Sequence, residues 1–190
     1  NITSMKANEI ARLGLVRSFQ ISAVFGHMSV LENVRVALQQ RMGNSFHFWK
    51  SERSLRELDD QVMQLLAEVD LQSFAQTLAV ELPYGRKRAL ELATTLALDP
   101  FVLLLDEPTQ GMGSEDVDMV VELVRKAAAN RTVLMVEHNL SVVSRLCDRI
   151  TVLARGSVLA EGDYESVSAN PQVREAYLGS EAATLEEAHA

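Results

Sequence analysis

The chain has 190 residues, of which 47% are hydrophobic and 23% charged, and its formal net charge is −8. This composition is typical of a globular protein and excludes a disordered acidic chain, while the negative charge disfavours binding driven by a nucleic-acid backbone. The longest clean apolar run near the middle is Phe101 to Leu105, which is far shorter than the roughly 20 residues of a membrane span. The single cysteine, Cys147, excludes an internal disulfide and fits a reducing compartment.

The first half is predicted to be mostly helical. Apolar residues at helical spacing predict four helices, over residues 6–15, 30–38, 51–69 and 86–98. Between the first two, residues 16–21 form an extended segment that contains Gln20. Ser29 and Glu32 have the spacing of a capping box at the start of the second helix, and residues 41–50 are expected to form a loop.

The second half is predicted to alternate strands with helices. Short, apolar and partly β-branched runs predict strands at residues 101–105, 132–136, 150–153 and 158–160. Such runs are typical of strands buried on both faces of a parallel sheet. Ser114 is expected to cap one helix, a second is expected over 140–147, and a last short one over 170–179, before an acidic tail. This order predicts an α/β architecture with right-handed crossovers.

Two adjacent carboxylates, Asp106 and Glu107, follow the apolar strand at 101–105. They are therefore expected at the carboxyl edge of the sheet, where α/β proteins bind ligands. Asp106 is suited to hold Mg²⁺, and Glu107 is then free to orient or deprotonate a water that attacks a phosphate. The alternative is a strand that ends in solvated acids, but the apolar run before the pair and Pro108 after it favour a site.

A basic helix start forms the second candidate site. Gly85 would let the backbone approach a ligand, and the helix that follows presents its N-terminal amides. Arg86, Lys87 and Arg88 add positive charge there, so phosphate is the natural ligand. The alternative is a basic helix start on a solvated face.

Two weaker signals accompany these sites. His138 follows the strand at 132–136, which brings it to the same sheet edge as Asp106 and Glu107, although a lone histidine is more often structural. Gln20 follows an extended segment and is weak by itself. The four histidines, His27, His47, His138 and His189, show no metal-ligand spacing, and the Gly-x-Ser-x-Gly motif of serine hydrolases is absent.

In chain order, these motifs resemble the nucleotide-binding subunit of an ABC transporter. Gln20 is similar to the Q-loop, Leu82–Arg86 to the signature loop and Asp106–Glu107 to the Walker B pair. Gln110–Ser114 resembles the D-loop and His138 the switch histidine. The resemblance implies an α/β fold: an ABC-type P-loop NTPase core, here partial, with an inserted α-helical subdomain.

Segments 13–20, 30–34 and 170–179 look more specifically like the branched-chain amino acid and urea uptake branch. This likeness implies ATP and Mg²⁺ as cofactors, and integral-membrane permease subunits and a second nucleotide-binding subunit as partners. A periplasmic solute-binding protein would act indirectly, and no nucleic acid is expected. The subunit would attach peripherally to the cytoplasmic face of the inner membrane.

The resemblance also implies a sandwich dimer with two ATP molecules at its interface. Gln20 would sense Mg²⁺ and the attacking water, Glu107 would act on that water, and His138 would contact the γ-phosphate. Asp106 and Gln20 are the implied metal residues. The implied nucleotide-contacting residues of the signature loop and D-loop are Pro83, Tyr84, Gly85, Arg86, Gly111 and Gly113.

The chain departs from the family pattern at several positions. Pro83 stands where the signature usually has serine, Arg86 where it has glutamine, and Gly113 where aspartate or asparagine is common. The Gly-x-x-x-x-Gly-Lys-Ser/Thr phosphate loop does not occur in the sequence, and in this family it lies upstream of the Q-loop. The chain, which begins at Asn1, is therefore expected to be the C-terminal three-quarters of a subunit and to be inactive alone.

The resemblance divides the chain into four expected parts. These are a remnant of the core up to the Q-loop, a helical subdomain with the signature loop, an α/β core, and a C-terminal helix with its tail: residues 1–20, 21–95, 96–162 and 163–190. Two other functions stay open. One is an ABC-type ATPase of DNA repair or translation, which the short helical lobe and acidic charge disfavour. The other is a non-catalytic interaction module.

Overall fold

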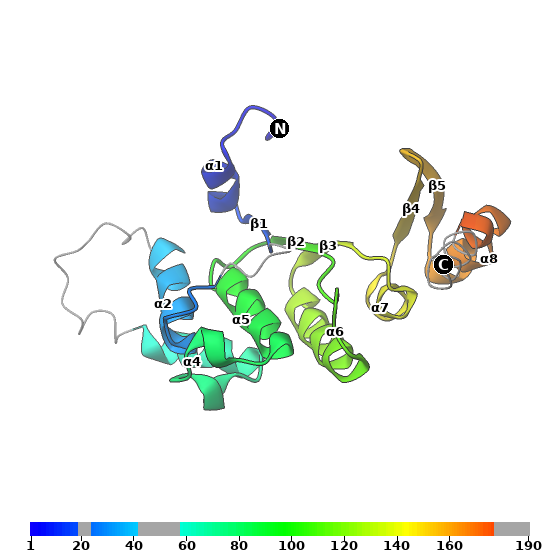
Figure 1. Cartoon of the computed structure of the whole chain (residues 1–190). Coiled ribbons are helices and arrows are strands. Elements are labelled where there is room, and N and C mark those ends of the chain that lie inside the picture. Colours follow the sequence, from blue (N-terminus) through cyan, green and yellow to red (C-terminus); the bar gives the residue numbers. More distant parts are fainter. Residues whose placement is uncertain (19–23, 42–57, 177–190) are drawn as a thin grey trace, which may run out of the picture. The chain divides into compact units, whose positions relative to one another are not determined.

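The structure of the protein, a computed structural model, describes residues 1–18, 24–41 and 58–176. It divides into two compact units, Asn1–His138 and Asn139–Ala190, which are described separately below (Figure 1). The expected loop at 41–50, the start of the helix expected from Ser51, and Gln20 lie wholly or largely outside the described residues. The four-part division expected from the sequence stays a prediction.

The first unit contains a parallel sheet in the order β1-β2-β3. Its strands are β1 (Leu15–Arg17), β2 (Val102–Asp106) and β3 (Thr132–Val136). Leu15 pairs with Val102, and Val102 pairs in turn with Thr132. The parallel strands of the first unit were predicted from their short apolar runs, and the prediction is confirmed for β2 and β3.

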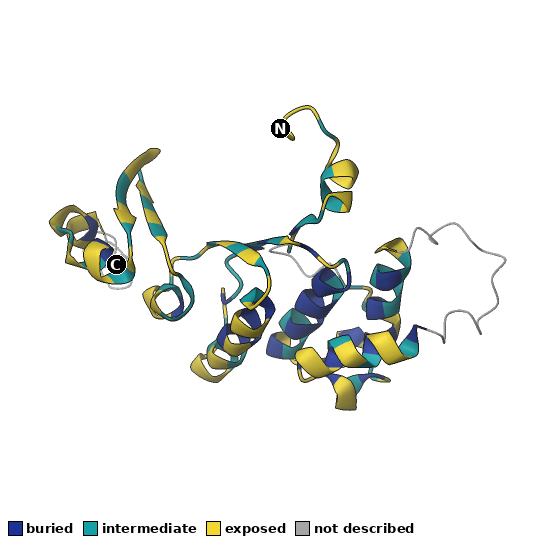
Figure 2. Cartoon of the chain, turned by 180° about the vertical axis from the view of Figure 1, so that it is seen from behind, coloured by how far each residue is buried: buried dark blue, intermediate teal, exposed yellow. Residues whose placement is uncertain are grey.

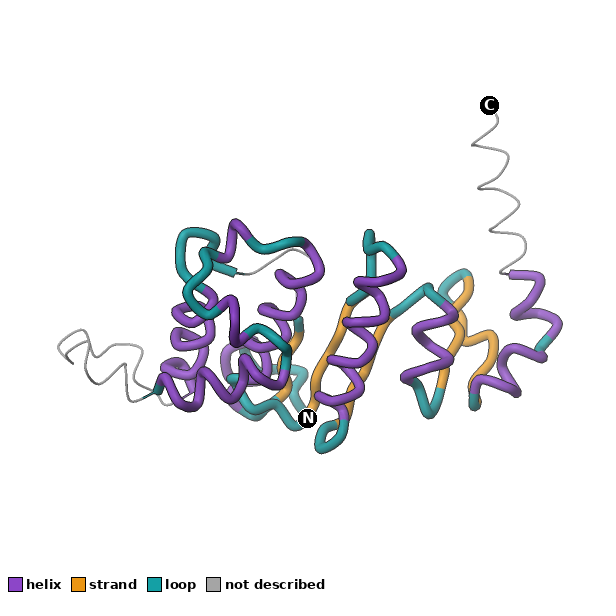
Figure 3. The backbone as a smooth tube through the Cα atoms, turned by 90° about the horizontal axis from the view of Figure 1, so that it is seen from below, coloured by secondary structure: helices purple, strands orange, loops and turns teal. Residues whose placement is uncertain are grey.

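All the described helices of this unit except α1 contribute side chains to an apolar core. The helices are α1 (Ala7–Arg12), α2 (Val30–Arg41), α4 (Asp59–Glu68), α5 (Tyr84–Leu96) and α6 (Ser114–Ala128), with short 3₁₀ turns at Gln72–Phe74 and Ala79–Glu81. Helices α5 and α6 lie on one face of the sheet, and α6 runs alongside β2 and β3 (Figures 1 and 3). Helix α5 is the most buried (Figure 2), and Leu90 on α5, Leu103 on β2 and Val121 on α6 are fully buried. Truncating such a leucine to alanine typically costs about 2–5 kcal/mol of stability.

Helix α2 begins with the capping box that the sequence predicts. The Ser29 backbone N–H donates to Glu32 Oε2 at 2.7 Å, and the Glu32 N–H donates to Ser29 Oγ at 3.2 Å. The buried Asn33 side chain bonds both the N–H and the carbonyl of Phe25, at 2.7 and 3.1 Å. The turn that leads into α2 is therefore fixed by side chains of its own first turn.

Three expectations for this unit need correction. The helix expected over 6–15 ends at Arg12, because Gly14 adopts a left-handed φ of 85° and Leu15 already belongs to β1. Ser114 is the first residue of α6 and not its cap, since the extended Gly113 holds the cap position. Strand β3 was expected to be buried on both faces, but its residues alternate between exposed and half-buried.

The second unit contains an antiparallel hairpin, which the sequence analysis wrongly assigned to a parallel sheet. Its elements are α7 (Leu140–Leu146), β4 (Ile150–Ala154), β5 (Ser157–Gly162) and α8 (Tyr164–Ala169), followed by a helix over 171–176. Ala154 pairs with Ser157 across a two-residue turn. Both turn residues, Arg155 and Gly156, have positive φ, 51° and 79°, as in a type I′ turn, which matches the twist of a hairpin. Helix α8, capped by Asp163, was not predicted.

Candidate active site

Asp106, the last residue of β2, lies at the carboxyl edge of the parallel sheet. Arg17 ends the neighbouring β1, and its Nη2 lies 2.6 Å from Asp106 Oδ2. The Asp106 side chain is 27% exposed and that of Arg17 57%, so water screens the pair and leaves the carboxylate accessible. The sequence analysis missed Arg17, because it lies 89 positions from its partner.

Glu107 follows with a left-handed backbone, φ 44°. Its N–H donates to the Val136 carbonyl of β3 at 2.9 Å, and its own carbonyl accepts from the Gln110 N–H at 3.1 Å. A left-handed conformation costs a residue with a Cβ about 1–2 kcal/mol. The hydrogen bonds on both sides of Glu107 hold it in this conformation directly after the strand.

His138 lies beside Glu107, as the sequence analysis expected. The distance from His138 Nδ1 to Glu107 Oε1 is 3.4 Å, and that to Glu137 Oε2 is 3.7 Å. The His138 side chain is 67% exposed, so it is accessible from solvent. The sheet edge therefore brings Asp106, Glu107 and His138 together, whereas Gln20 lies outside the described residues.

A buried carboxylate, Glu137, supports this edge and was not predicted. Its side chain is only 1% exposed. It accepts hydrogen bonds from the Thr109 N–H at 3.3 Å, from the Thr109 hydroxyl, and from the His138 N–H at 2.8 Å. Because these donors satisfy a buried charge, Glu137 ties the turn after Glu107 to the end of β3. The only sequence signal was an acid between an apolar strand and a histidine.

The expected signature loop forms the start of α5, with Pro83 at the N-cap position. Gly85 is buried, and a Cβ built on it would lie 2.5 Å from Asp116 Oδ1 and 2.9 Å from Met119 Cε, both on α6. The structure thus explains this glycine by helix packing within the chain, which the sequence analysis did not consider. Tyr84 is exposed, and its hydroxyl donates to the Gln110 carbonyl.

Arg86 points its guanidinium toward the helical part of the unit. Its Cζ lies 4.4 Å from the centroid of the Phe74 ring, and its Nη1 donates to the Asp70 carbonyl at 3.0 Å. These contacts engage the Arg86 guanidinium, which the sequence analysis expected to bind a phosphate. Arg86 would have to leave them to reach a ligand.

The expected D-loop links β2 to α6. Gly111 has a left-handed φ of 74°, which favours glycine, whereas Gly113 has an ordinary φ of −72°. A Cβ on either glycine would meet nothing within 4 Å. The space around both residues is therefore open in this chain.

A buried ion pair lies within α5. Arg88 Nη1 donates to Glu91 Oε2 at 2.7 Å, and the two side chains are 9% and 8% exposed. Burial alone would lower the pKa of Arg88, but the hydrogen bond and charge of Glu91 outweigh it, so the pKa is raised. Both residues line a small cavity that also touches Ser18 and Asp106.

The described ranges contain neither a cluster of metal ligands nor a helix that could span a membrane. Within residues 1–18, 24–41 and 58–176, no three or more His, Cys, Asp or Glu side chains gather where they could hold a metal ion. In the same part of the chain, no helix has the length and apolar character needed to cross a bilayer.

The fold is that of an ATP-binding cassette. The family model described as "ABC transporter" matches residues 2–110, and that described as "Branched-chain amino acid ATP-binding cassette transporter" matches residues 157–183. A solved structure titled as the ADP conformation of MJ1267, an ATP-binding cassette of an ABC transporter, superposes with a TM-score of 0.75 at 23% identity. The superposition covers 94% of this chain and 73% of the chain of the solved structure. The chain belongs to the ATP-binding family of ABC transporters.

Curated relatives of this chain include ATP-binding proteins of branched-chain amino acid transport. The chain is 36% identical over 185 residues to the high-affinity branched-chain amino acid transport ATP-binding protein BraF of Pseudomonas aeruginosa. That match covers 94% of this chain and 72% of BraF. It is 33% identical over 186 residues to LivG of Escherichia coli K12, which carries the same description, with 94% and 73% covered. The recognition made from the sequence is therefore confirmed at the level of the family.

Proposed function

We propose that this chain is the ATP-binding and ATP-hydrolysing part of an importer for branched-chain amino acids. The family membership and the descriptions of BraF and LivG support this function. The observation that carries the catalytic part is the edge of the sheet, where Glu107 follows Asp106 directly and lies 3.4 Å from the imidazole of His138. Urea and related small solutes are the alternative cargo, since they belong to the same branch in the resemblance drawn from the sequence.

The donor set of this edge fits Mg²⁺ and a nucleotide. Asp106 offers an accessible carboxylate oxygen, which is the ligand type that Mg²⁺ prefers, and Mg²⁺ would neutralise phosphate charge there. Since the described residues hold no cluster of three ligands, water and phosphate oxygens would complete the coordination. Glu107 would orient or deprotonate the attacking water, His138 would contact the γ-phosphate, and Gln20 would sense the metal.

The start of α5 serves a second subunit in this proposal. Pro83, Tyr84 and the first amides of α5 would face the nucleotide of the partner, together with the open Gly111 and Gly113. The free N–H groups of a helix start favour a phosphate without a charged side chain. This fits the engagement of Arg86 with Phe74 and Asp70.

An exposed apolar patch is a candidate docking surface for the permease. Phe25, Leu78 and Val80 are 56%, 39% and 53% exposed, and we call these three residues the apolar patch. Backbone contacts hold its two segments together, since the Val80 N–H donates to the Gly26 carbonyl at 3.0 Å and Ser29 bridges to Leu78. A permease segment that covered this patch would attach the subunit peripherally to the cytoplasmic face of the inner membrane. The solute-binding protein would then act through the permease.

Hydrolysis is tested with a chimera that carries the phosphate-loop segment of a relative ahead of Asn1. The chimera should bind Mg-ATP and hydrolyse it, and Glu107→Gln should keep binding while the rate falls about 10²-fold or more. Glu68→Gln, an exposed acid at the end of α4, is the matched control and should hydrolyse normally. Equal rates for Glu107→Gln and the control would refute the role of Glu107. Binding without hydrolysis in the unmutated chimera would favour the non-catalytic module.

The partner is tested by co-purification with the permease. Phe25→Ser with Val80→Ser should abolish it, because the variant removes most of the apolar area of the patch. Leu153→Ser removes an even more exposed apolar side chain, 71% exposed, from β4 of the second unit and should have no effect. Loss of the permease in the Leu153 variant alone would contradict the assignment of the patch.

A further inference from the structure

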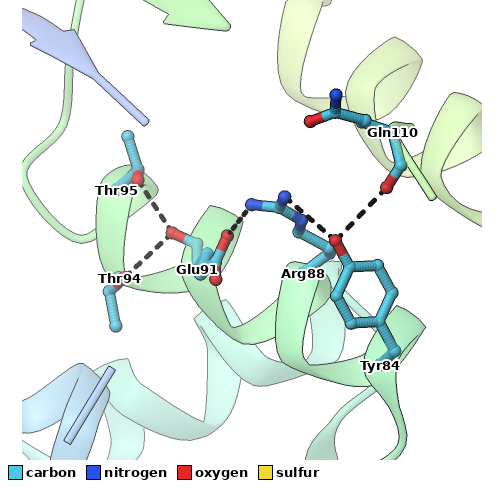
Figure 4. Close-up of polar contacts among 6 residues, drawn as sticks. All are labelled: Tyr84, Arg88, Glu91, Thr94, Thr95 and Gln110. Carbon is cyan, nitrogen blue, oxygen red and sulfur yellow. Dashed lines mark hydrogen bonds and ion pairs between the residues drawn. The ribbon is translucent and has the colours of Figure 1, made fainter. Parts of the chain in front are cut away.

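A continuous chain of polar contacts joins the core of α5 to the loop after Glu107 (Figure 4). Glu91 Oε2 accepts from Arg88 Nη1 at 2.7 Å, and Arg88 Nη2 donates to the Tyr84 hydroxyl oxygen at 3.2 Å. The Tyr84 hydroxyl then donates to the Gln110 carbonyl, also at 3.2 Å. We call these contacts the α5 relay. The Gln110 N–H closes the turn on the Glu107 carbonyl at 3.1 Å, so the relay ends on the turn that Glu107 begins.

The direction of each hydrogen bond in the relay is fixed by chemistry. A guanidinium has donors only, so the Tyr84 oxygen must accept from Arg88. A carbonyl has acceptors only, so the single hydroxyl proton of Tyr84 must go to Gln110. The Arg88 guanidinium also lies 5.5 Å from the centroid of the Tyr84 ring, which adds a second contact to the same side chain. Arg88 therefore fixes both the position of the ring and the orientation of the hydroxyl.

Apolar side chains in place of a buried ion pair such as Arg88–Glu91 are often neutral or stabilising. Pairs of this spacing stabilise a helix just as well on its surface, where the charges stay hydrated. Here both side chains are more than nine-tenths buried, and Glu91 Oε1 has no hydrogen-bond partner among the described residues. An apolar pair at these positions would avoid that desolvation. What the ion pair supplies, and an apolar pair would not, is a fixed donor to Tyr84.

The turn after Glu107 is anchored on its other side by β3. The Glu107 N–H bonds the Val136 carbonyl, and Thr109 bonds the buried Glu137 carboxylate. These anchors hold the turn to the sheet but leave the Gln110 carbonyl facing α5. The α5 relay is thus the link between this turn and the helix that begins with Pro83, Tyr84 and Gly85.

We propose that Tyr84 is a positioning residue, which holds the turn from Glu107 to Gln110 in place, and that the buried Arg88–Glu91 pair orients Tyr84 for this task. The inference rests on the proposed function, because Glu107 is the base only if the chain acts on ATP. It extends that function by coupling the start of α5 to the general base of the same subunit. A change at the start of α5 would then reach the turn of Glu107 through the Tyr84 hydroxyl.

The first test measures backbone hydrogen exchange in the 190-residue chain. Tyr84→Phe keeps the ring and removes the hydroxyl, so the amides of Gln110 and Met112 should exchange about tenfold faster, while the unfolding midpoint and the amide of the buried Val121 stay unchanged. Tyr164→Phe, on α8 of the second unit, is the matched control and should leave these amides unchanged. Unchanged exchange at Gln110 in Tyr84→Phe would overturn the proposal.

A second variant separates positioning from stability. Arg88→Met combined with Glu91→Leu replaces the buried pair with apolar side chains of similar length, which should keep or raise the unfolding midpoint. If the pair orients Tyr84, this variant should still loosen Gln110 as Tyr84→Phe does, and the two changes together should add little. Normal exchange at Gln110 in the double variant would overturn the role of the pair. If the double variant does not fold, Tyr84→Phe alone decides.

The chimera with a phosphate loop supplies the functional measurement. Tyr84→Phe should lower kcat for ATP about five- to tenfold, because the hydroxyl positions the turn of Glu107. KM should change less than kcat, since the variant keeps the ring that Tyr84 would present to the partner's nucleotide. An unchanged kcat together with faster exchange would refute the functional role of the relay. A chimera without any hydrolysis would refute the proposed function instead, and hydrogen exchange would still decide whether the relay positions the turn.

Discussion

At Gly85, an added side chain would force side chains of α6 to shift. The atoms that a Cβ would meet are ends of the Asp116 and Met119 side chains. Gly85→Ala should therefore destabilise the chain, and Asp116→Ala should relieve much of this loss. We expect a coupling free energy of about 1 kcal/mol between the two changes in urea unfolding. Strictly additive effects would contradict the packing explanation.

The packing of Gly85 against α6 also decides which variants can test whether two subunits form a dimer. Gly85→Asp would add negative charge where the sequence predicts a phosphate. In the structure, its carboxylate would meet that of Asp116 on α6 of the same subunit. The variant would thus disturb one subunit before it reports on a partner, and Pro83 is the better position.

Glu32 gives the capping box a pH dependence. The pKa of Glu32 is lowered by the hydrogen bond from the Ser29 backbone N–H and then by the Ser29 hydroxyl. A carboxyl whose pKa is lower in the folded state stabilises the fold above its unfolded value and loses this contribution as pH falls through the folded value. Because Glu32 is exposed, Glu32→Gln should cost only about 0.5 kcal/mol at pH 7 and nothing at pH 2, measured by urea unfolding.

Single residues were predictable from the sequence where their partners are near in the chain. Ser29 and Glu32 lie three positions apart, and the box forms as expected. Arg17 and Asp106 lie 89 positions apart, and Thr109 and Glu137 lie 28 apart. Only the parallel register of the sheet brings these pairs together, so no local pattern could indicate them.

At the scale of elements, the hairpin of β4 and β5 depends on its turn. Gly156 has a left-handed φ of 79°, and a Cβ there would meet nothing within 4 Å. Gly156→Ala should therefore destabilise the second unit by conformational strain alone, by about 1 kcal/mol. Arg155→Asn should have the opposite effect, since asparagine tolerates the φ of 51° better than arginine. Hydrogen exchange of the β4 and β5 amides measures both changes.

The direction of these strands could not be predicted from their apolar runs. Residues 150–153 and 158–160 have the same composition as buried parallel strands, and such runs do not reveal their partner. The decisive signal was the turn between them, where Arg155 and Gly156 leave no room for a crossover helix. For β2 and β3 the connection is long enough to hold α6, and the parallel prediction was correct.

At the scale of the whole molecule, the sequence lacks a phosphate loop. Such a loop binds nucleotide through converging backbone amides and a lysine, and the acids Asp106 and Glu107 would repel a nucleotide that arrives without them. The 190-residue chain alone should therefore hydrolyse no ATP and bind it at best in the millimolar range, about 4 kcal/mol. Calorimetry that gave micromolar Mg-ATP affinity for this chain would show that the nucleotide site is misplaced.

The family and the fold class were predictable because motifs and element order are carried by the sequence itself. The alternation of strand and helix around Asp106 and His138 indicated the parallel sheet, and the comparisons confirmed the family. The division into two compact units at His138 was not foreseen. It depends on how many contacts cross between segments, which a linear pattern does not record.

The left-handed backbone at Glu107 has an evolutionary consequence. Glycine would occupy a φ of 44° without strain, and asparagine would do so more easily than glutamate. Folding alone would thus favour the loss of glutamate at this position, and only selection for chemistry would retain it. A gene copy released from that selection should drift toward glycine or asparagine here while its fold becomes more stable. The amino acid at this one position would then record whether a lineage still uses the site.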